Sequence, residues 1–143
     1  MPTASPDRLL RLAMRVVGVI FIAVIWPLTQ VWPSGWSWDD GCASHYLPMI
    51  LGIYATLGTC LLWASRDPRG NLGLVWFTVW SSLVHAGIMA VQALGDHPMA
   101  GHLLGDVPAL VLVAGLLGVP ATRLRSTGSV LAAPQQATNG KAR

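Results

Sequence analysis

Four long apolar segments constrain the fold of this chain more than any other feature. They span roughly residues 9–31, 46–64, 72–94 and 103–119 of the 143-residue sequence. A helix needs about 20 apolar residues to cross a bilayer, with a range near 17–25, and each segment meets this requirement. Because lipid offers no partner for exposed backbone groups, we expect each segment to form a transmembrane helix.

The composition argues against an ordinary soluble domain. The chain is 53% hydrophobic and only 10% charged, whereas typical soluble domains carry about 25% charged residues. The mean hydropathy of +0.54 agrees. A soluble four-helix bundle would show a polar face at the helical period, and these segments lack a charged face. The sequence therefore predicts an all-α fold: a four-helix transmembrane bundle over residues 9–120, with a disordered N-terminus at 1–8 and a disordered cytoplasmic tail at 121–143.

The basic residues predict an orientation. All nine lie before or at the start of the first segment, between the second and third, or after the fourth: Arg8, Arg11, Arg15, Arg66, Arg69, Arg123, Arg125, Lys141 and Arg143. By the positive-inside rule, both termini should be cytoplasmic (N-in/C-in), and we expect a multi-pass protein of a bacterial inner membrane. The lipid bilayer is then the expected partner of the apolar surface. Because topology explains the basic charge, nucleic acid is not an expected partner.

Acidic residues and histidines gather at the opposite side. The two connections predicted there hold Asp39, Asp40, His45, Asp96, His97 and His102, and Asp106 lies about one turn into the fourth segment. The types of Asp96, His97 and His102 suit a metal. Their spacing, "DHPMAGH", matches no established zinc pattern, so these three are metal candidates only and no metal is assigned.

Four polar residues inside the segments predict a pocket. The helical period places Ser81, His85 and Gln92 on one arc of the third segment, together with Thr78. Tyr54 should lie level with His85, and Asp106 level with Gln92. Charged groups in hydrocarbon cost roughly 2.5–3.5 kcal/mol on insertion scales. We therefore expect Tyr54, His85, Gln92 and Asp106 to face inward around a ligand-binding pocket that opens to the outside.

Simpler interpretations stay open beside this pocket. His85 could hydrogen-bond Tyr54 or a backbone carbonyl without binding anything, and Asp106 could be an acid favoured by the dipole of a helix N-terminus. Small-residue stripes, Gly101/Gly105/Ala109 and Gly52/Thr56, predict close helix contacts within the bundle or between subunits of a homo-oligomer. The patterns G-x-S-x-G, H-E-x-x-H and C-x-x-C are missing from the sequence, so no enzyme activity is assigned.

Three functions fit these features. The first is a small-molecule binding or carrier module that uses the pocket. The second is an accessory structural subunit of a membrane complex, whose polar residues hold helices together. The third is a redox subunit in which His85, with His97 or His102, ligates haem or a metal or contacts a quinone. No cofactor is assigned, and the ligand is not identified.

Several strings resemble a known family. They are "VWPSGWSW", "GIYATLG", "ASRDP", "WFTVWSSLVHAGIMAVQ" and "GHLLGDVPAL", within roughly residues 31–113. Together they resemble small four-span bacterial membrane proteins of the domain-of-unknown-function family 6632. The resemblance implies a four-span bundle and carries no activity, so it implies no catalytic residue. A weaker likeness, of layout only, is to DoxX-like four-helix membrane proteins.

Overall fold

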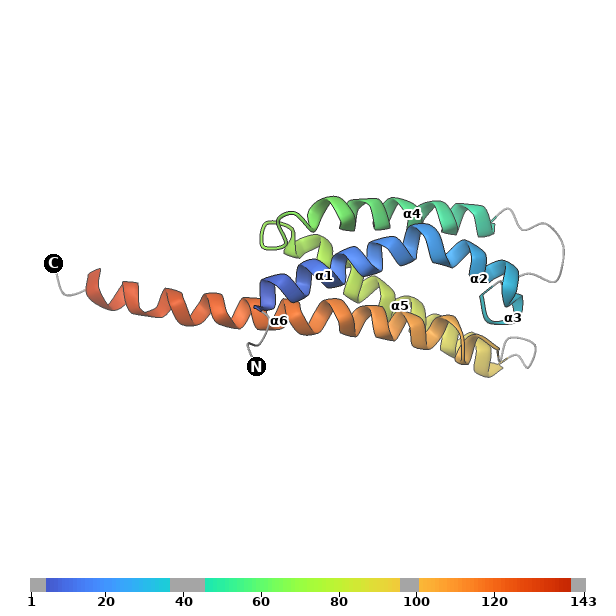
Figure 1. The fold of residues 1–143 in the computed structure, drawn as a ribbon. Helices are drawn as coiled ribbons and strands as arrows, with labels where there is room; N and C mark the ends of the chain where they lie inside the picture. The colour runs from blue at the N-terminus through green and yellow to red at the C-terminus, as the bar shows by residue number, and fades with distance from the viewer. Residues whose placement is uncertain (1–4, 37–45, 96–100, 140–143) are drawn as a thin grey trace.

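The protein is a bundle of four long helices (Figure 1). The computed structural model describes residues 5–36, 46–95 and 101–139, and it contains no strand in these ranges. The first long helix has three parts, α1 (Pro6–Val19), a π-helical turn η1 (Ile20–Val24) and α2 (Ile25–Val31), and the short α3 (Pro33–Trp36) follows it. The other long helices are α4 (Tyr46–Ala64), α5 (Leu72–Gly95) and α6 (Asp106–Asn139).

The long helices suit a membrane in both length and surface. The stretches Pro6–Val31, Leu47–Ala64, Leu72–Gly95 and Gly101–Ser126 are long and apolar enough to cross one. Large apolar side chains point away from the bundle, among them Ile53, Phe77 and Val91, which are 68%, 62% and 72% exposed. Water would make such a surface costly, whereas acyl chains cover it at no such cost. The predicted fold class, an all-α four-helix bundle with membrane-spanning helices, is confirmed.

The C-terminal helix differs from the sequence expectation. We expected a helix over 103–119 and no regular structure over 121–143, but α6 begins at Asp106 and continues to Asn139. In Figure 1, α6 extends well past the ends of the other helices. Pro120 resembles a stop signal because proline removes one helical hydrogen bond. The helix continues across it because Ala121 and Leu124, on the far side of the proline, are buried in the bundle core.

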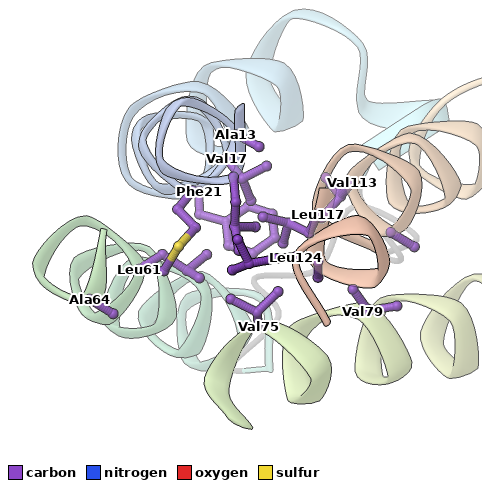
Figure 2. Close-up of a cluster of buried hydrophobic side chains, with 14 residues drawn as sticks. Ala13, Val17, Phe21, Leu61, Ala64, Val75, Val79, Val113, Leu117 and Leu124 are labelled. Carbon is purple, nitrogen blue, oxygen red and sulfur yellow. The ribbon is translucent and has the colours of Figure 1, made fainter. Parts of the chain in front are cut away.

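The main core fills one half of the bundle. Side chains from all four long helices converge there (Figure 2). Its buried members are Leu10, Ala13, Met14, Val17, Phe21, Leu61, Ala64, Val75, Val79, Val113, Ala114, Leu117, Ala121 and Leu124. At the end of this half lie the start of α1, the connection between α4 and α5, and the part of α6 that carries Arg123. We call it the arginine end, because Arg8, Arg11, Arg15, Arg66, Arg69 and Arg123 lie there.

Polar contacts fasten the arginine end. Asp7 on α1 accepts a hydrogen bond from Arg69 Nε at 3.2 Å and forms an ion pair with Arg11 at 3.5 Å. One helix pitch deeper, Arg15 Nε donates to Ser65 Oγ at 3.3 Å. These contacts join the start of α1 to the connection between α4 and α5. The two ion pairs of Asp7 are solvent-exposed, so each contributes at most about 1 kcal/mol, whereas Ser65 is buried.

Two glycines lie at a close crossing of α1 and α4. A Cβ atom on Gly58 would lie 2.7 Å from the carbonyl oxygen of Gly18, and one on Gly18 would lie 2.9 Å from the carbonyl oxygen of Gly58. The backbones of α1 and α4 therefore touch directly. The predicted Gly52/Thr56 stripe does not make this contact: a Cβ on Gly52 would meet nothing within 4 Å, and Thr56 is exposed.

Candidate functional site

The half of the bundle away from the arginine end contains a cavity of about 490 Å³. Backbone contacts are extensive between α5 and α6, between α1 and α4, and between α1 and α6. In the described part of the chain, α4 and α5 are not such a pair, so side chains must span the space between them. The walls are mainly apolar and include Phe21, Ile25, Ile50, Leu51, Ile88 and Leu110.

A π-helical turn shapes one wall of this cavity. The backbone N–H of Ile25 donates to the carbonyl of Ile20, five residues earlier instead of four. Pro27 follows closely, and proline both lacks an N–H and crowds the carbonyl four residues before it, here that of Ala23. The turn carries the buried Phe21, whose ring packs edge-on against that of Tyr54 with centroids 5.0 Å apart. Such turns are frequent at functional sites.

Tyr54 and His85 meet across the cavity. The Tyr54 hydroxyl lies 3.4 Å from His85 Nδ1, and the two ring centroids are 6.1 Å apart. The pair bridges α4 and α5 where their backbones are separated. A distance of 3.4 Å is long for a hydrogen bond with a hydroxyl group, so the contact is weak. Either group can act as donor, according to the imidazole tautomer.

The polar arc predicted on α5 divides between core and cavity. Ser81, His85 and Gln92 line the cavity, in that order along the helix. Ser81 Oγ already donates to the Thr78 carbonyl at 3.2 Å. Thr78 itself is fully buried in the packed half and donates to the Leu74 carbonyl at 2.9 Å. Thr78 is therefore a structural residue, whereas the other three border open space.

A buried histidine–aspartate pair stands at the start of α6. His102 Nδ1 lies 2.7 Å from Asp106 Oδ2, and the two residues are 1% and 6% exposed. A turn of 3-10 helix at residues 101–103 precedes α6 and places His102 one helical turn before Asp106. The sequence prediction missed this pair because it placed His102 in a connection. The spacing of four residues was the available signal.

The metal candidates do not form a site in the described ranges. Asp96 and His97 lie outside the residues that the structure describes, and His102 contacts Asp106 instead. Within residues 5–36, 46–95 and 101–139, no group of three His, Cys, Asp or Glu side chains is close enough to hold a metal ion.

All four predicted pocket residues line the same cavity: Tyr54, His85, Gln92 and Asp106. Their ligand-binding role stays a prediction. Two further lining residues were not assigned to the pocket. Thr29 donates to the Trp26 carbonyl at 2.7 Å, and Trp36 of α3 has a buried indole nitrogen without a hydrogen-bond partner in the described part of the chain. Tryptophans at membrane surfaces follow the same sequence pattern, so nothing in the sequence singled out Trp36.

Comparisons with known proteins identify a family of unknown function. Neither the curated proteins nor the solved structures contain a match to the chain. The likeness to DoxX-like proteins is not shown by any comparison. The family model for DUF6632, described as a family of unknown function, matches residues 4–137, nearly the whole chain. The chain therefore belongs to this family, DUF6632, as its quoted strings predicted.

Proposed function

We propose that the protein is a membrane-embedded binding or carrier module for a small, mainly apolar and uncharged molecule. The observation that carries this proposal is that Tyr54, His85, Gln92 and Asp106 all line one cavity. Its volume of about 490 Å³ falls within the roughly 300–1,000 Å³ of small-molecule sites, which are also mostly apolar with a few polar groups.

The lining favours an uncharged ligand. Asp106 Oδ2 lies 2.7 Å from His102 Nδ1, so this carboxylate oxygen already has a polar partner within the protein. Tyr54, His85 and Gln92 offer hydrogen-bond donors and acceptors along one wall. A suitable ligand would place a ring or chain against the apolar walls. It would place one carbonyl or hydroxyl group near Tyr54 and His85, where that group can form hydrogen bonds.

The proposed orientation places the cavity toward the cell exterior. The arginine end carries the basic residues of the helix starts and connections, which the positive-inside rule assigns to the cytoplasm. The cavity lies at the opposite end of the bundle. In a bacterial inner membrane, a ligand would then reach it from the outer side or from the outer leaflet.

Mass spectrometry of co-purified small molecules tests the proposal. The full chain is purified in mild detergent beside Ala109→Phe, which fills the cavity from α6, and Gly87→Phe. Gly87 is the matched control, because a Cβ there meets nothing within 4 Å. We expect a compound that is retained by the wild type and Gly87→Phe and lost from Ala109→Phe. Identical small-molecule contents in all three proteins would contradict the proposal, and a Soret band would support a haem subunit instead.

A purely structural role for His85 is the second candidate, favoured by its contact with Tyr54. Replacement of His85 by Leu separates the two roles. If His85 binds the ligand, the His85→Leu variant loses the co-purified compound and keeps its thermal stability. If His85 is structural, the variant has lower thermal stability, and its folded fraction still binds the compound.

A further inference from the structure

We propose that a groove between α1 and α6 at the arginine end binds one anionic phospholipid. One acyl chain lies in the groove and the phosphate is held by Arg123. This groove shares no lining residue with the cavity, so the inference is independent of the proposed function.

The groove has the shape for an acyl chain. It encloses about 300 Å³, and its walls include Leu12 and Val16 of α1 and Leu116 and Val119 of α6. All four of these side chains are exposed on the outer surface of the bundle. Gly115 forms its inner end, where a Cβ atom would meet nothing within 4 Å. The missing side chain thus leaves space that hydrocarbon fills in a bilayer.

The length of the groove matches one leaflet. Gly115 and Arg123 are about 12 Å apart along α6 at 1.5 Å per residue. The hydrocarbon of one leaflet is about 15 Å deep, half of a typical bilayer core. The groove therefore runs from near the bilayer midplane to the headgroup level, where Arg123 lines its end.

Charge selects an anionic occupant. A guanidinium binds a phosphate through two parallel hydrogen bonds, and basic pockets between transmembrane helices bind acidic headgroups. Arg8 on α1 is also exposed at this end and adds to its positive charge. A zwitterionic lipid offers the same phosphate but adds a cation that these arginines repel.

The inference is tested by thermal unfolding of the delipidated full chain in mild detergent. The measurement is repeated with added dioleoyl-phosphatidylglycerol and with added dioleoyl-phosphatidylcholine. Two variants alter the groove: Arg123→Gln removes the phosphate partner, and Gly115→Leu fills the space for the chain. Two variants are matched controls: Arg66→Gln removes an exposed arginine of the same end, and Gly73→Leu enlarges an α5 glycine whose Cβ meets nothing within 4 Å.

We expect phosphatidylglycerol to raise the unfolding temperature of the wild type and both controls more than phosphatidylcholine does. Arg123→Gln should bind phosphatidylglycerol about tenfold more weakly, the loss typical of a charge-assisted hydrogen bond. The unfolding temperature of Gly115→Leu should not rise with either lipid. If Gly115→Leu does not fold, Val119→Phe fills the groove from an exposed position instead.

Two results would overturn the inference. An equal loss in Arg123→Gln and Arg66→Gln would show general surface attraction without a site. A change of oligomeric state in Gly115→Leu, measured by light scattering, would show that a second copy of the chain covers the groove.

Discussion

Two histidines in this bundle have opposite surroundings. His85 borders the cavity and contacts Tyr54 at 3.4 Å, whereas His102 is buried and contacts Asp106 at 2.7 Å. The short contact has the length of a charge-assisted hydrogen bond, and the long one is a weak neutral contact. The two histidines should therefore respond differently to substitution.

Loss of His102 should destabilise the protein strongly. His102→Leu leaves the buried Asp106 carboxylate without its imidazole, at a cost of about 3–5 kcal/mol in the free energy of unfolding. The double variant His102→Leu/Asp106→Leu should recover most of this loss, because it also removes the Asp106 carboxylate. Unfolding in mixed detergent and denaturant measures all three proteins. A double variant as unstable as His102→Leu would show that the pair is not the source of the effect.

The Tyr54–His85 contact should contribute little to stability. Hydrogen bonds between membrane helices average about 0.6 kcal/mol and reach about 1.7 kcal/mol. A double-mutant cycle with Tyr54→Phe and His85→Leu should give an interaction energy in this range. A value near 3 kcal/mol would mean that the contact holds α4 to α5, and the structural role of His85 would then be correct.

At the scale of the helices, the Gly18–Gly58 crossing determines how closely α1 and α4 pack. Gly58→Ala should lower the free energy of unfolding by about 1–3 kcal/mol, because its Cβ would lie 2.7 Å from a backbone oxygen that cannot move alone. Gly52→Ala on the same helix is the control. Its Cβ meets nothing within 4 Å, so stability should stay equal or rise slightly through helix propensity. Equal losses in both variants would contradict the crossing.

The sequence predicted helix existence better than helix ends and contacts. Apolar length alone placed α4 at residues 46–64 and nearly placed α5. The predicted end of the fourth helix was wrong because the sequence shows Pro120 as a local stop signal. It does not show the burial of Ala121 and Leu124, which depends on tertiary packing. Small residues in the sequence indicated that helices pack closely, but not which helices are in contact, so the Gly18–Gly58 contact was not predicted. Period and depth together placed the four pocket residues on one cavity, because hydrocarbon leaves polar groups few other positions.

At the scale of the whole molecule, the bundle has a packed half and a hollow half. The main core occupies the arginine end, and a small cluster of Ala86, Met89 and Leu110 packs beside the cavity. The helices separate where α4 stays with α1 and η1 while α5 stays with α6. The volume of the cavity follows from this divergence and from the π-helical turn, and neither is visible in hydropathy.

Cysteine labelling from one side of intact cells tests the central claim, that the cavity opens at the outer end of an N-in/C-in bundle. Cys42 and Cys60 are first replaced by serine, and single cysteines are introduced as Gln92→Cys in the cavity wall and Arg66→Cys at the arginine end. A membrane-impermeant maleimide should label Gln92→Cys in intact cells, and Arg66→Cys only after permeabilisation. Labelling of both positions from the same side, or of Gln92→Cys from neither side, would contradict the account.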